Sequence, residues 1–360
     1  MGNLSDNLGQ LLIIGFDGTS VEDGVKSLLA RFRPAGVILF ARNLVAPEQT
    51  RKLTEDLQSF ADELGIGPLL IGIDHEGGKV VRMGPPLTRF PGNLALARTG
   101  SLDLARRQAR AMAEELLAMG VNWNFAPCVD VNSNPRNPII GERAFGDNPE
   151  KVSAFGAAMI EEFQQRGLIA CAKHFPGHGD TAVDSHLGLP CVSRPLESLR
   201  EIELPPFRGA IAAGVASIMT AHIVFPALDA ARPATASARI IGGLLREELG
   251  FEGVVVSDAL EMAGFANSIG LKEGAPACIN AGVDLLMVCN GRQAQEEVLS
   301  ALQEASAAGR LDTEMIERAQ GRVDSMKKAF LRDRAATPLA RVGCEEHRAL
   351  EAEIAGAGRL

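Results

Sequence analysis

The chain has 360 residues, of which 46% are hydrophobic, and a formal net charge of −9. This length fits one large α/β barrel or two ordinary domains, and the apolar fraction is sufficient for a full core. A broad surface for nucleic acid or anionic membranes needs clustered Lys and Arg, so the acidic balance argues against both partners. A few local arginines would still allow an anionic substrate.

The chain carries few signs of export or membrane insertion. The first apolar run, LLIIGF, is shorter than a signal peptide and lacks a basic segment before it. No apolar run approaches the length of a membrane span. The six cysteines form no CxxC pair, and several lie in apolar runs such as LIACAK. Free, buried thiols are typical of a reducing compartment, so we expect a cytoplasmic protein.

Short runs rich in Val, Ile and Leu recur along the chain and predict strands. In chain order they are LLIIGF at 11, GVILFA at 36, PLLIGI at 68, VNWNFA at 121, LIACAK at 168, ASIMTA at 216, GVVVSD at 253 and DLLMVC at 284. Continuous apolar runs are typical of parallel strands buried on both faces. Trp123, in the fourth run, is expected to pack inside the resulting barrel.

Longer amphipathic stretches between these runs predict helices, for example PEQTRKLTEDLQSFADELG and SLDLARRQARAMAEELLAMG. A glycine closely precedes seven of the eight runs and predicts that a helix ends there. These glycines are Gly36, Gly65, Gly120, Gly167, Gly214, Gly250 and Gly282. Eight strands that alternate with helices predict the α/β class and a single (β/α)8 barrel of the TIM type.

We predict that the barrel occupies residues 1–332. Residues 333–360 are expected to form a loop and a short C-terminal helical tail, not an independent domain. A doubly wound open sheet is the alternative architecture. That fold usually carries a glycine-rich phosphate turn after its first strand, and GFDGTS matches GxGxxG poorly.

Polar residues follow nearly every predicted strand. In chain order they are Asp17, Arg42, Asn43, Asp74, Glu76, Asp130, Lys173, His174, His222, Asp258 and Asn290. The carboxyl ends of the strands form the active site in barrels of this type. Any one of these residues is also typical of a polar loop, but their recurrence predicts a site at this end.

The segment KHFPGHGDTAVDSH, residues 173–186, contains three of the six histidines and two aspartates. His174 and His178 are four residues apart, a spacing that binds zinc when the segment is helical. Phe175, Pro176 and Gly177 lie between them and disfavour a helix. Metal binding and a merely solvated loop are therefore the weaker interpretations, proton transfer is favoured, and we expect no metal and no cofactor.

Four segments together resemble family 3 glycoside hydrolases of the β-N-acetylhexosaminidase branch, whose bacterial members act in cell-wall recycling. They are DHEGGKVVR, DVNSNPRNPIIGERAFGDNP, KHFPGHGDTAVDSH and VVVSDALEM. The resemblance covers roughly residues 8–330. Its Lys-His…Asp-x-His element is specific to this branch of the family.

The resemblance implies a role for each matching residue. Asp258 is similar to the nucleophile, and His186 to the general acid/base with Asp184 as its partner. The residues that would hold the non-reducing N-acetylglucosamine are Asp74, Arg82, Arg143, Lys173 and His174. Two positions depart from the pattern: His75 replaces the usual Gln, and Ala259 replaces the second Asp of many members.

The implied enzyme is a retaining β-N-acetylhexosaminidase that acts on a small carbohydrate, namely terminal β-linked N-acetylglucosamine of peptidoglycan (muropeptide) fragments. Retention requires a carboxylate nucleophile and a proton donor, and an imidazole with a pKa of about 6.5 suits the second role. The alternatives are a glycoside phosphorylase, a β-glycosidase of another specificity, and a sugar-binding barrel without catalysis.

Overall fold

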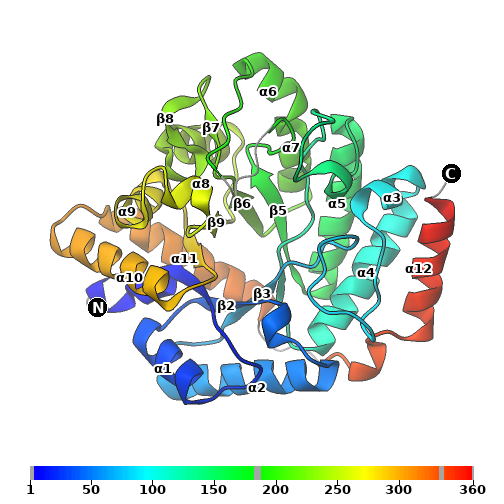
Figure 1. Cartoon of the computed structure of the whole chain (residues 1–360), viewed down its shortest axis with the longest axis horizontal. Helices are drawn as coiled ribbons and strands as arrows, with labels where there is room; N and C mark the ends of the chain where they lie inside the picture. Colours follow the sequence, from blue (N-terminus) through cyan, green and yellow to red (C-terminus); the bar gives the residue numbers. More distant parts are fainter. Residues whose placement is uncertain (1–3, 182–187, 332–335, 359–360) are drawn as a thin grey trace.

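The computed structural model describes residues 4–181, 188–331 and 336–358 of the chain, and a closed barrel lies at its centre (Figure 1). Its eight strands follow the order β1-β10-β9-β6-β5-β4-β3-β2. Every neighbouring pair is parallel. The strands are β1 (Leu12–Gly15), β2 (Gly36–Leu39), β3 (Leu70–Ile73), β4 (Trp123–Asn124), β5 (Ile169–Phe175), β6 (Ser217–Thr220), β9 (Val254–Ala259) and β10 (Leu285–Val288).

Each barrel strand begins within one of the eight apolar runs, so the predicted barrel is confirmed. The ring closes because β1 pairs with both β2 and β10, which excludes the open doubly wound sheet. A short antiparallel hairpin after β6 was not predicted. It consists of β7 (Val224–Phe225) and β8 (Asp229–Pro233).

Helices surround the barrel as an outer layer (Figure 1). They are α1 (Asp23–Phe32), α2 (Pro47–Leu64), α3 (Asn93–Arg98), α4 (Leu102–Ala118), α5 (Pro149–Arg166), α6 (Leu196–Ile202), α7 (Leu204–Ala212), η5 (Arg239–Glu248), α8 (Ala263–Ala266), α9 (Leu271–Ala281), α10 (Arg292–Ala307), α11 (Thr313–Phe330) and α12 (Glu345–Ala357). Of these, η5 is a π-helix. The 3-10 helices are η1 (Leu4–Leu11), η2 (Ala41–Asn43), η3 (Gly141–Arg143), η4 (Ala234–Ala236) and η6 (Leu339–Arg341). Within the described ranges, no helix has the length and apolar character needed to cross a bilayer.

The glycines before the strands behave as predicted with one exception. Gly65 ends α2 with a φ of 63°, a conformation that a residue without Cβ adopts at little cost. The prediction for Gly36 is wrong, because it lies inside β2 and the left-handed residue that ends α1 is Arg33. A Cβ at Gly36 would lie 2.2 Å from the carbonyl oxygen of Leu70, so close strand packing explains the glycine.

Apolar side chains fill the inside of the barrel. Trp123 is fully buried, as expected, and its ring centroid lies 4.7 Å from that of Phe125. Its indole N–H donates to Ser217 Oγ over 2.9 Å, so the one polar atom of this large side chain is satisfied. The cluster also includes Ile13, Ile38, Leu70, Ile169, Met219, Val256 and Leu285. Since the interior is packed, a ligand must bind at an end of the barrel.

The predicted terminal helix is present as α12, which packs against α3 and α4 (Figure 1). His347 of α12 lies with its Nδ1 2.8 Å from Glu115 Oε1 of α4. Glu115 also accepts the backbone N–H groups of Thr88 and Gly343. These bonds attach the tail to the outer layer, and the division of the chain at residue 332 stays a prediction.

Candidate active site

The carboxyl ends of the barrel strands surround a cavity of about 500 Å³. It is lined by five of the predicted site residues: Asp74, Arg143, Lys173, His174 and Asp258. They come from the segment after β3, from η3, from the end of β5 and from β9. Arg82 adjoins the cavity through its ion pair with Asp74 at 2.8 Å. The sequence therefore predicted correctly which of these distant residues gather at one end of the barrel.

Lys173 links two acidic side chains beneath the cavity. Its Nζ lies 2.8 Å from Asp74 Oδ1 and 2.7 Å from Glu76 Oε1, and only 2% of the side chain is exposed. Burial alone would lower the pKa of Lys173, but the two carboxylates outweigh it and raise that pKa. Burial likewise opposes ionisation of Asp74, yet Lys173 and Arg82 hold the pKa of this carboxyl below its usual value. Both groups are therefore charged.

Glu76 extends this ion network to the loop after β4. Its two carboxylate oxygens accept bonds from Arg143 Nε at 2.9 Å and Nη2 at 2.8 Å, a bidentate geometry. Although burial opposes it, pairing with Arg143 and Lys173 lowers the pKa of Glu76 strongly. Sequence analysis placed Glu76 at a strand exit but gave it no role. The available signal was its position two residues after Asp74.

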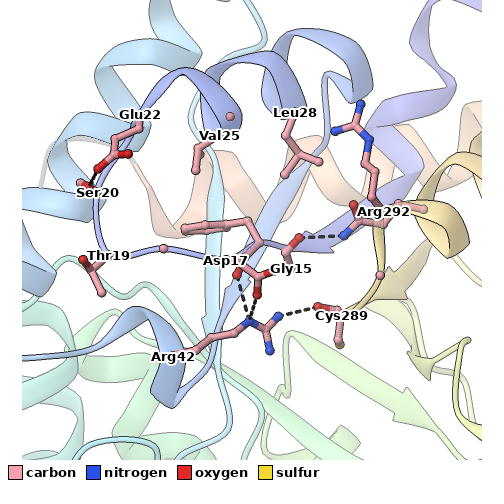
Figure 2. Close-up of a pocket in the computed structure, with 15 residues that line it drawn as sticks. Gly15, Asp17, Thr19, Ser20, Glu22, Val25, Leu28, Arg42, Cys289 and Arg292 are labelled. Carbon is pink, nitrogen blue, oxygen red and sulfur yellow. Dashed lines mark hydrogen bonds and ion pairs between the residues drawn. The ribbon is translucent and has the colours of Figure 1, made fainter.

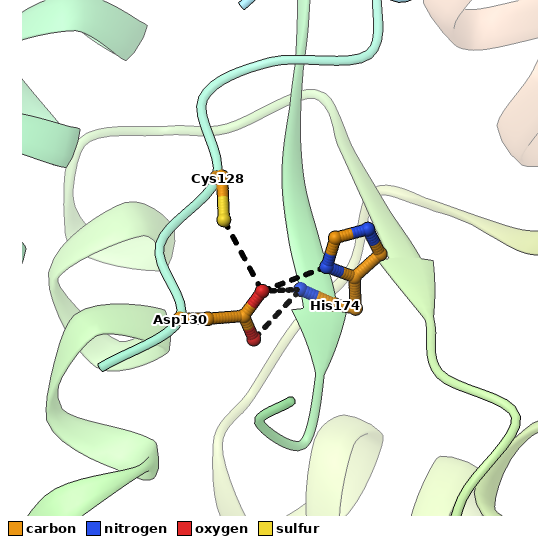
Figure 3. Close-up of side chains that lie close together, drawn as sticks. All are labelled: Cys128, Asp130 and His174. Atoms are coloured by element: carbon orange, nitrogen blue, oxygen red, sulfur yellow. Dashed lines mark hydrogen bonds and ion pairs between the residues drawn. The ribbon is translucent and has the colours of Figure 1, made fainter. Parts of the chain in front are cut away.

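Asp130 holds the turn that follows β5. Its Oδ1 accepts the backbone N–H groups of His174 at 3.1 Å and His178 at 2.7 Å. Its Oδ2 lies 2.7 Å from the Nδ1 of His174 (Figure 3). Burial would raise the pKa of Asp130, but His174 lowers it strongly. Because Asp130 accepts at Nδ1, that nitrogen carries the proton and Nε2 faces Arg143 Nη2, 3.4 Å away.

Asp130 is thus a second residue whose role the sequence did not reveal. The thiol of Cys128 also points at it, with 3.2 Å between Sγ and Oδ2 (Figure 3). Cys128, Asp130 and His174 offer possible metal ligands within 4.8 Å of one another, and their types would suit zinc. However, burial raises the pKa of the Cys128 thiol well above its usual value, and Asp130 raises it further. The hydrogen bonds account for the geometry of the three side chains without an ion.

Lys173 and His174 are adjacent in β5, yet both side chains line the cavity. Successive residues of a regular strand point to opposite faces. Here the pairing of β5 with β6 shifts register between Lys173 and Phe175. Such irregularities change the direction of a side chain and are common beside active sites.

Asp258 stands near the end of β9 and is partly buried in the cavity wall. Its Oδ1 accepts the N–H of Ala259 over 2.8 Å, which fixes the carboxylate. His222, another strand-exit residue, lies behind β9, with Nε2 3.0 Å from the carbonyl oxygen of Ala259 and Nδ1 2.9 Å from Thr235 Oγ1. It therefore supports the strand that carries Asp258.

His186 and Asp184, the predicted acid/base pair, lie outside the described residues. The segment that leads to them is not a helix: β5 ends at Phe175 and residues 176–181 form an irregular turn, as the proline and glycines predicted. His178 Nδ1 lies 2.8 Å from Thr181 Oγ1, and Asn137 donates to the carbonyl oxygens of His178 and Gly179. At Gly179, a Cβ would lie 1.5 Å from the carbonyl oxygen of Val131, so only glycine fits this close approach.

A second cavity, of about 420 Å³, lies beside the first, at the ends of β1 and β10 (Figure 2). Arg42 crosses it, bonded to Asp17 at 2.9 Å, to the carbonyl oxygen of Cys289 at 2.7 Å and to Asn290 Oδ1 at 2.9 Å. Asp17 is 93% exposed. Cys289 lines both cavities. Two of the strand-exit residues, Asp17 and Arg42, thus pair with each other instead of facing the first cavity.

A protein-family model and several known relatives match this chain. The family model described as "Glycosyl hydrolase family 3 N terminal domain" matches residues 3–326. A β-hexosaminidase of Thiobacillus denitrificans is 38% identical over 297 residues, 81% of each chain. β-Hexosaminidase A of Pseudoalteromonas piscicida is 38% identical over 363 residues, which cover 94% of this chain but only 60% of that relative.

A solved structure agrees with these matches. It is a family 3 β-N-acetylglucosaminidase from Paenibacillus sp., 42% identical, with a TM-score of 0.96 over 99% of this chain and 69% of that one. The family match covers most of the barrel, and the identity of the relatives extends over most of the chain. The chain therefore belongs to glycoside hydrolase family 3, among its β-hexosaminidases.

Proposed function

We propose that this protein is a retaining β-N-acetylhexosaminidase that removes terminal, non-reducing β-linked N-acetylglucosamine from muropeptide fragments of peptidoglycan. The observation that carries the proposal is the position of Asp258, whose carboxylate lines the same 500 Å³ cavity as the ion network of Asp74, Glu76 and Lys173. A cavity of this size accommodates a sugar ring. The substrate class follows from the relatives, and the muropeptide origin from the family resemblance.

In the proposed mechanism, Asp258 attacks the anomeric carbon and forms a glycosyl-aspartate. The bond to the leaving oxygen breaks as His186 protonates that oxygen, and His186 then removes a proton from the water that hydrolyses the intermediate. Asp184 would accept a hydrogen bond from the imidazole, fix its tautomer and favour its protonated form. These two roles rest on the family motif, since both residues lie outside the described ranges.

The charges around the cavity support this chemistry. Three cations and three carboxylates balance each other in the surrounding network, namely Lys173, Arg82, Arg143, Asp74, Glu76 and Asp130. Asp258 and Glu261 also line the cavity, and neither has an ion pair among the described residues. The transition state of glycoside cleavage resembles an oxocarbenium ion, so this excess of carboxyl groups favours it relative to the neutral substrate.

The ion network also suits the binding of sugar hydroxyls. Each oxygen of Asp74 bonds to a different cation, Oδ1 to Lys173 and Oδ2 to Arg82. The carboxylate is therefore fixed in position before a substrate arrives, with lone pairs left to accept hydroxyl protons. Groups that need no rearrangement on binding lower the entropic cost of orienting the ring for attack.

The activity test uses a nitrophenyl N-acetyl-β-glucosaminide, a nitrophenyl β-glucoside and a muropeptide disaccharide. We expect hydrolysis of the first and third and little of the second. Glycosyl phosphate formed in phosphate buffer would identify a phosphorylase instead, and preference for the glucoside would indicate another specificity. Binding without turnover of any substrate would leave only the non-catalytic sugar-binding barrel.

A further inference from the structure

Glu203 is a buried carboxyl group beneath the turn that follows β5. It stands between α6 and α7, and only 1% of it is exposed. Its Oε1 accepts a hydrogen bond from Ser133 Oγ over 3.0 Å. Its Oε2 is buried and has no hydrogen-bond partner among the described residues. The proposed mechanism uses none of these atoms.

The orphan oxygen lies directly under the turn. A Cβ built on Gly177 would be 2.4 Å from Glu203 Oε2, so the carboxyl group fills the space that a side chain at Gly177 would need. The φ of Gly177 is also positive, at 139°, which is a second reason for glycine. Gly177 lies between His174 and His178, both of which Asp130 holds from the other side by their backbone N–H groups.

Asp130 and Glu203 therefore support the same turn, but Asp130 is surrounded by hydrogen-bond donors and Glu203 is not. Asp130 receives bonds from two backbone N–H groups, an imidazole and a thiol, so its negative charge is well stabilised. Glu203 receives one bond from a hydroxyl group, and Asp130 is a negative charge nearby. An ionised Glu203 would be a buried charge with too few donors, whereas a neutral acid in this place costs far less.

We propose that Glu203 acts as a neutral carboxylic acid and is a positioning residue for residues 176–181, the turn that follows His174 and leads to the proposed acid/base. The inference rests on the proposed function, because it assigns this turn to catalysis. When Glu203 ionises at alkaline pH, its carboxylate must move into contact with water or a cation. The turn above it then shifts, and His174 leaves its position in the cavity.

The charged groups that face Glu203 agree with this assignment. Burial raises the pKa of Glu203 to about 8, and the negative charge of Asp130 adds to the effect. Arg194 acts against it, but Arg194 is already paired with Asp180 at 2.5 Å, and Asp180 opposes ionisation in turn. These are the charged groups near Glu203 among the described residues of the loops after β4 and β5 and of the segment before α6.

The raised pKa of Glu203 determines how the stability of the fold changes with pH. A carboxyl group whose pKa is raised in the folded state contributes stability that is full below pH 4.5, its usual pKa, and that is lost as the pH rises through about 8. Glu203→Gln keeps the shape and neutrality of the acid but cannot ionise. Its thermal midpoint should therefore rise relative to wild type between pH 5 and pH 8 and then stay constant relative to it.

The test compares wild type, Glu203→Gln and Glu203→Ala from pH 5 to pH 9.5, in thermal unfolding and in kcat on the nitrophenyl N-acetyl-β-glucosaminide. At pH 7 we expect Glu203→Gln to keep kcat within about threefold of wild type and Glu203→Ala to lose more than about tenfold, since it also removes the group that fills the space under Gly177. Above pH 8, log kcat of wild type should fall by more than one unit per pH unit, because two groups lose protons. For Glu203→Gln it should fall by one unit per pH unit only.

Glu115→Gln is the matched control. Glu115 is also a buried carboxyl group, but its hydrogen bonds to His347 and Thr88 overcome burial and lower its pKa. Its substitution should therefore cost most stability above pH 4.5, which is the opposite sign, and should not alter the slope of the kcat profile. An inactive wild type would contradict the proposed function and leave the unfolding experiment informative. Equal pH dependence of unfolding in wild type and Glu203→Gln, or equal losses of kcat in both variants at pH 7, would overturn the inference.

Discussion

Two buried ion clusters lie at opposite ends of the barrel. The mouth cluster, at the carboxyl ends of the strands, consists of Asp74, Glu76, Arg82, Arg143 and Lys173. The floor cluster, at the amino ends, consists of Asp284, Arg246 and Arg322, with ion pairs of 2.6 and 2.8 Å. Asp284 also accepts the N–H of Val255 at the start of β9. Burial and pairing alone would not distinguish the two clusters.

The two clusters differ in whether their hydrogen-bonding groups are all bonded to protein or also line a cavity. Asp284 uses both oxygens on arginines and the backbone, and Arg246 donates to the carbonyl oxygens of Phe251 and Gly253. The floor cluster thereby joins η5 and α11 to β9 and β10. The mouth cluster instead lines the cavity that contains Asp258. We infer that the floor cluster stabilises the fold, whereas the mouth cluster binds substrate.

Removal of the nucleophile should have the largest effect on the mouth. Asp258→Asn should lower kcat by about four orders of magnitude or more, because no covalent intermediate can form. Its thermal midpoint should stay close to that of wild type, since the side chain lies in the cavity wall. Steady-state kinetics and thermal unfolding check the two parts. Substantial residual activity of pure protein would reject Asp258 as the nucleophile.

The next largest effect tests the proton donor at the mouth. His186→Ala should lose about 10²- to 10⁴-fold in kcat/KM on a disaccharide, whose sugar leaving group needs protonation. The loss on a nitrophenyl substrate should be much smaller, because nitrophenolate leaves with little help. Parallel kinetics on the two substrates provide the measurement. Equal losses on both would mean that another residue supplies the proton.

A matched pair of substitutions compares the clusters directly. Lys173→Met removes one of the two cations bonded to Asp74 and to Glu76, and Arg246→Met removes one of the two bonded to Asp284. Each variant should lose unfolding free energy, at most about 3–5 kcal/mol, because one cation remains on each carboxylate. Only Lys173→Met should also lower kcat/KM, because Arg246 lies at the far end of the barrel. Denaturant unfolding and kinetics well below the unfolding midpoint separate the two effects. A changed kcat in folded Arg246→Met would break the distinction between the clusters.

His75 tests a titratable group at the mouth that stands outside the ion pairs. It is buried, its Nδ1 has no hydrogen-bond partner in the part of the chain that the structure describes, and burial lowers its pKa to about 4. A histidine with a lowered pKa gives stability that is present above about pH 6.5 and lost as the pH falls toward 4. His75→Gln should therefore gain about 2 kcal/mol relative to wild type between pH 8 and pH 5. Urea unfolding at both values checks this, and an unchanged difference would show that His75 is not buried as a neutral base.

The smallest expected effect concerns Cys128, Asp130 and His174. Since hydrogen bonds already join these side chains, dialysis against EDTA should leave kcat unchanged. Metal analysis before and after dialysis accompanies the assay. A loss of activity that a divalent ion restores would show that the mouth uses a metal in addition to its ion pairs.

Much of the fold could be predicted from the sequence, because parallel strands are buried on both faces and read as continuous apolar runs. The location of the site followed from the same pattern, since polar residues such as Asp74 and Asp258 stand where these runs end. The β7–β8 hairpin escaped prediction because its strands are too short to show a period. Gly36 was misread because close packing within a strand and the end of a helix select the same residue.

The contacts that give individual residues their roles could not be predicted from the sequence. Glu76 matters because Lys173, 97 positions later, and Arg143 both bond to it. Asp130 matters because its side chain reaches the N–H groups of a turn 44 to 48 positions away. Both residues lie in segments that carry the family resemblance, but their bonding partners are distant in the sequence, so only the folded barrel shows what they do. The register shift in β5 that turns both Lys173 and His174 to the cavity is equally invisible in the sequence.

The most direct test of the proposed mechanism traps the covalent intermediate. Wild-type protein is incubated with a 5-fluoro-N-acetylglucosaminyl fluoride, digested, and its peptides are sequenced by mass spectrometry. We expect one glycosyl group per chain, attached to Asp258, and no label in Asp258→Asn. A label on any other residue, or time-dependent inactivation without a label, would contradict the assignment of Asp258 as the nucleophile of a retaining β-N-acetylhexosaminidase.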